Sequence, residues 1–377
     1  MRRRRGAPTT SRREFLRAGL GGTAAACVTA ACGDRVLGQN DGPLRVRENV
    51  KNISAARRDE LLDAFLLLKE LRSPFEPSLS YYDQFVRFHQ DSVLTARLNY
   101  GYSISHQCPT FLPWHRKILM LFENAVRTHI REDFALPYWD WTDSSSLDVI
   151  FTDDFLGPYL GDEDDNYSLS TSRLAKNEFS VNLTASQLTV DGTDVASNCP
   201  FTYIVRGPKS VDLPTSADVA ACLQVETYDS SPYDIDADND ESFRNYLLGI
   251  SPFQLHSVPH VWLGGQWDAD ISDGLFNSTS STFVGTMSAL DCSPNDPAFF
   301  IHHCNVDRIW AIWETLYGPQ YEPTSGWNTG WNRDDEMYPY SKYRDNPDMT
   351  WEGLTNGSMV GFESLGYTYD DLNAPTG

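Results

Sequence analysis

The apolar positions between residues 45 and 75 repeat with the period of an α-helix. The stretch "ARRDELLDAFLLLKELR" places its large apolar side chains at Leu61, Leu62, Phe65, Leu68 and Leu71. Spacings of three and four residues put these side chains on one face of a helix, and the charged residues on the other. The pattern therefore predicts an amphipathic helix that packs against a core.

Four later segments return to helical spacing. They are residues 80–92, 113–130, 241–265 and 295–318. We expect Pro113 to open the second of them, because the first turn of a helix tolerates proline. The intervening residues 143–235 are rich in Ser, Thr, Asp, Gly and Pro, which predicts long loops and a few short strands. Helices surrounded by long loops indicate a single, mainly-α domain.

Composition narrows the class of protein. The chain has 377 residues, 41% of them hydrophobic, which is enough for a substantial core. Its net charge is −22, although eight arginines lie within the first 35 residues, so the rest of the chain is more acidic still. Such a body repels nucleic acid and anionic membranes, and we expect neither as a partner.

Residues 1–32 predict an export signal. A basic start precedes an Ala- and Gly-rich stretch from Ala18 to Cys32, which is too short and too weakly apolar to span a bilayer. The segment "SRREFLR", from Ser11 to Arg17, resembles a twin-arginine signal, a route that suits a protein folded around a metal before export. We therefore expect a periplasmic or extracellular protein. Cys32 would be the residue for a lipid anchor, but "TAAC" matches a lipobox poorly.

Five cysteines follow this signal, and an odd number leaves at least one thiol unpaired. Cys199 and Cys222 flank a polar insert, and an exported protein permits disulfides. We expect these two cysteines to form a disulfide. Cys304 is expected to be a buried thiol beside His303, and Cys108 to be a structural thiol or part of a disulfide.

Histidines carry the candidate chemistry. Six of the eight fall in two groups of three on or beside the expected helices. One group is His89, His106 and His115, and the other is His256, His260 and one member of the pair at positions 302 and 303. Sets of imidazoles without Glu or Asp at ligand spacing favour copper, because di-iron bundles mix Glu with His. The sequence thus predicts two copper ions, each with three imidazole ligands.

The residues around these histidines resemble the tyrosinase family of type-3 dicopper proteins. The segment "HQCPTFLPWHRKILMLFE", from His106 to Glu123, is similar to that family's copper A signature, and "DPAFFIHHCNVD", from Asp296 to Asp307, is similar to its copper B signature. The segments "LPYWDW" and "YTYDDL" resemble further family features. The resemblance covers residues 45–372, which we expect to form one catalytic domain.

This resemblance implies a dicopper centre held in a four-helix bundle. It assigns His89, His106 and His115 to copper A, and His256, His260 and His303 to copper B, with His302 as a neighbour that packs nearby. It further implies an oxidase that converts o-diphenols to o-quinones with O2. Some relatives link a cysteine to the second copper A histidine, but the corresponding residue here is Ile104, so we expect no such thioether.

Three positions bear on the substrate. Relatives that also hydroxylate monophenols often carry a Glu eight residues before the first copper B histidine and an Asn directly after it, which hold a proton-accepting water. The corresponding residues here are Leu248 and Ser257, so we expect weak or absent monophenol hydroxylation. Val261 follows the second copper B histidine, which favours uncharged phenols. Leu290 is the candidate gate residue at the entrance to the site.

Three other readings of the family resemblance remain. The chain could be a tyrosinase with monophenolase activity, an o-aminophenol oxidase, or an O2 carrier of the haemocyanin type. The sequence ends eight residues after Tyr369, so we expect no C-terminal lid domain. A separate partner could then cover the site or deliver copper.

Overall fold

The computed structural model describes residues 43–184, 189–190, 193–194, 199–250, 254–269, 281–347, 349 and 354–375. The expected export signal at residues 1–32 lies outside the described residues and stays a prediction. The expected catalytic domain, residues 45–372, falls within one compact unit that spans Asn40–Gly377.

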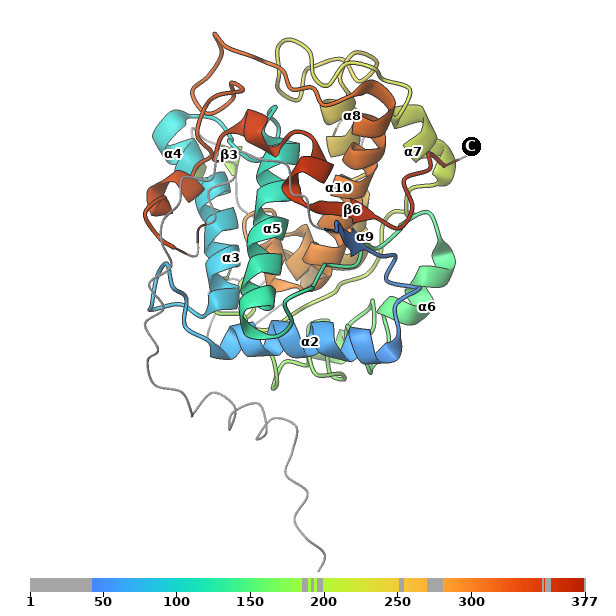
Figure 1. Ribbon diagram of the computed structural model, residues 1–377. Helices are drawn as coiled ribbons and strands as arrows, with labels where there is room; N and C mark the ends of the chain where they lie inside the picture. Colours follow the sequence, from blue (N-terminus) through green and yellow to red (C-terminus); the bar gives the residue numbers. More distant parts are fainter. Residues whose placement is uncertain are drawn as a thin grey trace, which may run out of the picture. The chain divides into compact units, whose positions relative to one another are not determined.

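Four helices form the centre of this unit, and the candidate ligands lie on them or in the residues that lead into them (Figure 1). They are α3 (Tyr81–Gln90), α5 (Phe111–His129), α9 (Ser257–Gly264) and α10 (Ala298–Tyr317). Figure 1 shows α3 and α5 side by side, with α2 (Ala55–Glu70) lying across one end of both. The prediction of a mainly-α fold with a four-helix bundle is confirmed.

The remaining elements are short, as the polar composition predicted. The helices are α4 (Ala96–Tyr100), α6 (Leu147–Ile150), α7 (Ser216–Cys222) and α8 (Phe243–Leu248), and a π-helical turn, η1, covers Asp91–Thr95. The strands form two-stranded pairs: β1 (Arg45–Arg47) with β6 (Tyr367–Tyr369), β2 (Thr189–Val190) with β3 (Thr193–Asp194), and β4 (Gln266–Ala269) with β5 (Ser281–Val284). None of the helices that the structure describes is long and apolar enough to cross a bilayer.

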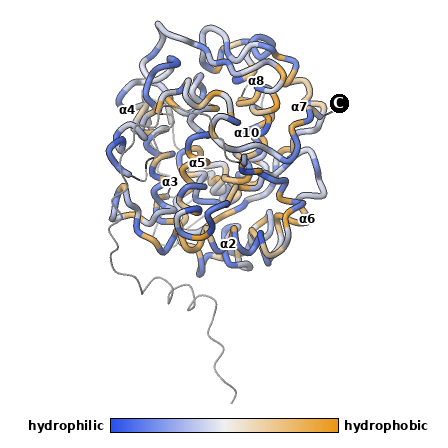
Figure 2. Tube along the Cα trace, viewed as in Figure 1, coloured by the Kyte–Doolittle hydropathy of each residue, from blue (hydrophilic) through white to orange (hydrophobic). Residues whose placement is uncertain are grey.

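Local sequence explains where the helices begin. The Ser54 and Ser80 side chains accept hydrogen bonds from the first turns of α2 and α3, at Arg57 N and Asp83 N, which satisfies backbone donors that lack helical partners. The apolar stripe predicted on α2 is buried, from Leu61 to Leu68. Figure 2 shows apolar segments along the inward sides of the helices and hydrophilic segments outside.

The expected helix over residues 241–265 is wrong as a single element. The chain forms α8, leaves the helical path at Gly249 and re-enters it at α9. Gly249 has φ of +69°, and a Cβ atom there would lie 1.8 Å from the carbonyl oxygen of Gln254. Only glycine fits this close approach, so the break is built into the sequence. The other helices begin within three residues of their predicted starts.

A buried ionic network joins the chain's first and last strands to α5 and α10. Arg47 on β1 contacts Glu123 through two hydrogen bonds of 2.9 Å and Asp307 through one of 2.8 Å. Arg116 and the hydroxyl of Tyr369 also donate to Asp307. Burial by itself would raise the pKa of the Asp307 carboxyl, but the two guanidinium groups hold it below its usual value. The carboxylate is therefore ionised and fixes α10 against α5.

The expected Cys199–Cys222 disulfide is wrong. Cys199 and Cys222 are both free thiols, and all five cysteines after residue 32 are buried. The Cys222 thiol points to the carbonyl of Phe243, 4.0 Å away, and Cys199 lies apart from it near Thr286. Burial raises the pKa of Cys199 to about 12, so this thiol stays protonated. Cys304 is a buried thiol beside His303, as predicted, and of the two alternatives for Cys108 the structure has the free thiol.

Candidate metal centre

The structure brings His89, His106 and His115 together. His89 lies near the end of α3, His106 in the loop before α5, and His115 in the second turn of α5. The ring centroid of His106 is 4.9 Å from that of His89 and 4.8 Å from that of His115. All three side chains are buried, and their donor nitrogens lie within 4.8 Å of one another. This is the geometry of a three-imidazole metal site.

Backbone carbonyls orient two of these rings. His115 Nδ1 lies 2.8 Å from the carbonyl oxygen of Phe111, and His89 Nδ1 lies 3.3 Å from that of Asp291. A carbonyl only accepts, so each Nδ1 carries the hydrogen and each Nε2 keeps its lone pair. Both Nε2 atoms are buried without a hydrogen-bond partner. An unpaired buried nitrogen is costly, and a metal ion would satisfy it.

The second triad consists of His256, His260 and His303, which lie on or directly before two helices. His256 precedes the first residue of α9, His260 lies within α9 and His303 within α10. His260 Nε2 is 3.1 Å from His256 Nε2 and 3.3 Å from His303 Nε2. Metal–nitrogen bonds of about 2.0 Å place neighbouring donors about 3 Å apart, so these spacings fit a shared ion. The Nδ1 atoms of His256 and His260 face the carbonyls of Leu248 and Met287.

A fourth imidazole accompanies the second triad. His302 is fully buried, and its donor nitrogen lies within 4.8 Å of those of the other three. Its ring packs against Trp141, with centroids 5.1 Å apart, and against His256 at 5.3 Å. Neither of its nitrogens has a hydrogen-bond partner. His302 packs against the triad and lies within reach of the metal site, so its assignment as a neighbour and not a ligand stays a prediction.

The two triads adjoin at His115, whose ring contacts those of His303 and His256. The rings of His115 and His303 stack in parallel, with centroids 4.2 Å apart and planes 8° apart. Aromatic side chains wall this junction: Phe111 lies 4.7 Å from His256, and Phe299 lies 4.2 Å from His303, measured between ring centroids. Two metal ions held here would share a dry, aromatic environment.

Burial keeps these imidazoles neutral. It lowers the pKa of His89 to about 3 and that of His260 to about 4. Burial, together with neighbouring imidazoles, likewise lowers the pKa of His115 and His303 well below the usual value. Metal ligands must be deprotonated, so the site is ready to bind a cation at neutral pH.

The fold and the two triads define a helical protein built to hold two metal ions. Residues 79–316 match the family described as the common central domain of tyrosinase. The tyrosinase of Streptomyces lincolnensis is 31% identical over 301 residues, which cover 79% of this chain and 93% of the relative. Grixazone synthase of Streptomyces griseus subsp. griseus is 31% identical over 303 residues, covering 74% and 88%.

Solved structures agree on the fold. A functional unit of octopus haemocyanin aligns with a TM-score of 0.50 and 20% identity, covering 87% of this chain and 68% of that one. The chain belongs to the tyrosinase family. It is a copper-dependent oxidoreductase of that family, and its two imidazole triads fit two copper ions, as predicted.

Leu248 and Ser257, two of the positions predicted to shape the substrate pocket, lie beside His256 of the copper B triad. The carbonyl of Leu248 accepts from His256 Nδ1 at 3.2 Å and from the Ser257 hydroxyl at 2.8 Å. The Leu248 side chain is buried, while Val261 and Leu290 are partly exposed. Neither Leu248 nor Ser257 supplies a carboxylate or a carboxamide, so the side chains expected to hold a proton-accepting water are absent at these two positions. The role of Leu290 as a gate stays a prediction.

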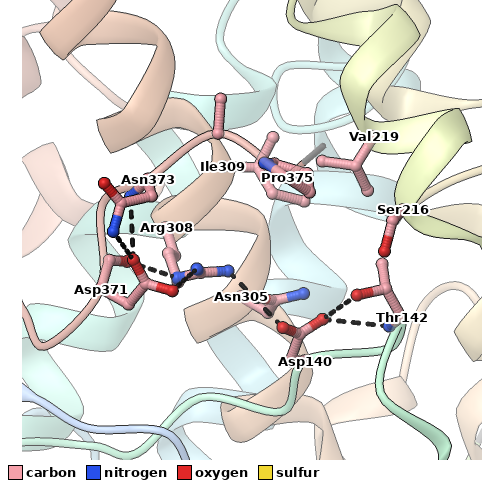
Figure 3. Close-up of a pocket in the computed structure, with 11 residues that line it drawn as sticks. Asp140, Thr142, Ser216, Val219, Asn305, Arg308, Ile309, Asp371, Asn373 and Pro375 are labelled. Atoms are coloured by element: carbon pink, nitrogen blue, oxygen red, sulfur yellow. Dashed lines mark hydrogen bonds and ion pairs between the residues drawn. The ribbon is translucent and has the colours of Figure 1, made fainter. Parts of the chain in front are cut away.

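A separate polar pocket of about 340 Å³ lies on another side of α10 (Figure 3). Its wall includes Asn305, Arg308 and Ile309, which the helical repeat turns away from His303. Arg308 donates to Asp371 and lies 3.9 Å from Asp140. The pocket is therefore distinct from the metal centre.

The sequence missed the groups that orient the ligands. Most are backbone carbonyls, which no sequence pattern identifies, and they lie from 4 to 202 residues along the chain from the histidine that they contact. Asp307, four residues after His303, binds two arginines and two tyrosines. The sequence also did not indicate Ser92 and Ser105, which lie beside the copper A triad, although Ser105 directly precedes His106.

Proposed function

We propose that this chain oxidises o-diphenols to o-quinones with O2, and hydroxylates monophenols weakly or not at all. Two diphenols and one O2 give two quinones and two waters. Two copper ions bound in the triads would supply the two-electron redox chemistry. The protein holds them with six neutral imidazoles and surrounds the junction with Phe111 and Phe299, which limit the access of water.

The observation that carries the substrate preference is the pair Leu248 and Ser257. Hydroxylation of a monophenol requires a base for its phenolic proton, and a positioned base contributes about 100-fold or more. The Ser257 hydrogen is committed to the carbonyl of Leu248, and the Leu248 side chain is apolar. A catechol loses its protons more easily, and its two adjacent oxygens can face two metal ions at once. Val261, partly exposed in the second turn of α9, presents an apolar surface that suits uncharged phenols.

The experiment compares matched substrates. Copper is quantified first, and quinone formation is then followed from a monophenol and from the catechol with the same substituent. We expect immediate quinone from the catechol, and a lag or no product from the monophenol. Equal initial rates without a lag would contradict the substrate preference. An o-aminophenol is assayed in parallel to test whether the protein is an o-aminophenol oxidase. Faster turnover of the aminophenol than of the catechol would make o-aminophenols the preferred substrate class.

The carrier alternative is addressed by the same assay. A carrier would hold two copper ions and bind O2 reversibly, but would give no quinone from either phenol.

A copper-delivery or lid partner is a further part of the proposal. If such a partner is required, the chain produced alone would take up less than two copper ions, and added copper salt would not restore the full content.

A further inference from the structure

His106 is the copper A ligand that lies outside a helix. His89 and His115 belong to α3 and α5, whose backbone hydrogen bonds fix their positions. His106 lies in the loop between α4 and α5, and its Nδ1 faces a side chain instead of a carbonyl. The partner is the hydroxyl oxygen of Ser105, 2.8 Å away. Because a hydroxyl can donate or accept, this contact alone does not define the protonation of the ring.

Two further contacts determine which ring nitrogen of His106 carries the hydrogen. Ser105 Oγ lies 2.7 Å from Ser92 Oγ, and Ser92 Oγ lies 2.8 Å from the carbonyl oxygen of His89. The carbonyl only accepts, so the Ser92 hydrogen goes to His89. Ser92 must then accept the Ser105 hydrogen, and Ser105 must accept the hydrogen on His106 Nδ1. The chain of donors therefore runs in one direction, and leaves His106 Nε2 with its lone pair.

Both hydroxyls are fully buried, so water does not compete for them. Ser92 reaches this position from η1, the π-helical turn that follows α3. A π-helical turn inserts an extra residue into a helix, and such turns are frequent at functional sites. Through the two serines, the loop that carries His106 is tied to the backbone of His89. Two ligands of the same metal ion are thus linked outside the ion itself.

We propose that Ser105 and Ser92 are positioning residues of copper A, which hold His106 as the Nδ1–H tautomer with Nε2 available to the metal. Among the other five expected ligands, four use backbone carbonyls for this purpose, and His303 Nδ1 has no partner. Copper A is therefore the site whose ligand orientation can be altered by substituting a side chain. The inference rests on the family's copper centre and is independent of the proposed preference for diphenols.

The test is copper retention in the holoenzyme. Wild type, Ser105→Ala and Ser92→Ala are titrated with a cuprous chelator, and the copper that remains is measured by mass spectrometry. Loss of an outer partner of a metal-bound histidine costs about 10-fold to 100-fold in metal affinity. We expect Ser105→Ala to release one copper at a chelator concentration lower by that factor, and the second copper as in wild type. Anomalous diffraction at the copper edge on chelator-treated crystals should show that copper A is vacated. Ser92→Ala should shift in the same direction by less, because Ser105 can still accept from His106.

Two variants separate positioning from general loosening. Ser105→Thr keeps the hydroxyl and should retain copper A close to wild type. Ser168→Ala removes another fully buried hydroxyl, which donates to Asp165 and contacts no histidine, and should leave both copper ions unaffected. Nitrogen NMR of the copper-free chain should report a single His106 tautomer in wild type and a mixture in Ser105→Ala. Wild-type copper retention in Ser105→Ala, equal loss of both ions, or the same loss in Ser168→Ala would each overturn the proposal.

Discussion

The two halves of the metal centre hold their ligands in different ways. Copper A has three buried imidazoles, and each has its Nδ1 hydrogen-bonded, two to carbonyls and His106 to a serine. Copper B has four imidazoles within reach, and neither His302 nor His303 has a partner for its Nδ1. His260 is also partly exposed, and Val261 beside it is partly exposed as well. The comparison indicates that copper A is the more rigidly defined half, and that copper B lies nearer the surface.

The largest effect should follow from removing one ligand in each half. His115→Ala leaves two imidazoles at copper A, so that ion should be lost and quinone formation should fall to that of the copper-free chain. His303→Ala leaves His256, His260 and the adjacent His302, so weak binding of copper B should persist. Copper content after dialysis measures both outcomes. The double variant with His302→Phe should lose copper B completely; equal copper loss in the two single variants would break the comparison.

The next largest effect should follow from a change in the buried ionic network around Asp307, which packs α10 against α5. Asp307→Asn leaves Arg47 and Arg116 without their shared carboxylate, and removing one partner of a buried ion pair costs about 3–5 kcal/mol. We expect the free energy of unfolding of the copper-free chain to fall by that amount in denaturant titration. Glu336→Gln is the matched control, because it breaks an exposed pair with Arg344, worth about 0–1 kcal/mol. Similar losses in both variants would contradict the role of the network.

The pH dependence of stability should separate the halves further. The folded-state pKa is about 3 for His89 and about 4 for His260, below the usual value near 6.5. The unfolded chain therefore binds more protons below pH 6.5, and folding stability should fall as the pH drops, by about 1.4 kcal/mol per pH unit for each histidine. The loss from His260 should end near pH 4, and that from His89 near pH 3. A copper-free chain with constant unfolding free energy from pH 6.5 to 4.5 would refute this.

The smallest effect concerns the substrate side of copper B. Ser257→Asn adds a carboxamide next to His256, but no carboxylate replaces Leu248. The substitution supplies only one of the two side chains that would hold a proton-accepting water. It should therefore shorten the lag with a monophenol and raise the initial rate by about 10-fold or less, since a complete positioned base contributes about 100-fold or more. The catechol rate serves as the internal control and should stay within a factor of about two. A catechol rate that rises in parallel would mean that Ser257 acts on a shared step.

The sequence predicted the helices that have a regular apolar repeat and the histidines that lie on or beside them. The apolar repeats placed α5 and α10 within three residues. The histidine spacing gave both groups of ligands except for the choice between His302 and His303, which the family resemblance made. The break at Gly249 escaped prediction because it depends on the close approach of Gln254, which is a tertiary contact. The disulfide prediction failed because spacing along the chain does not show that Cys199 and Cys222 are buried in different surroundings.

The serine pair escaped prediction for a related reason. Ser92 and Ser105 are thirteen residues apart and meet only because η1 and the loop before α5 converge on His89. Serines are common, and neither position carries a pattern that separates it from an ordinary buried serine. The hydrogen bonds that orient metal ligands thus become visible only in the folded chain.

The central claim is that six imidazoles in two unequal triads hold two copper ions. An anomalous difference map at the copper edge, from crystals of the copper-loaded chain, tests it most directly. The map should contain two peaks, one among His89, His106 and His115, and one among His256, His260 and His303. A single peak, or a second peak outside the copper B triad, would contradict the account.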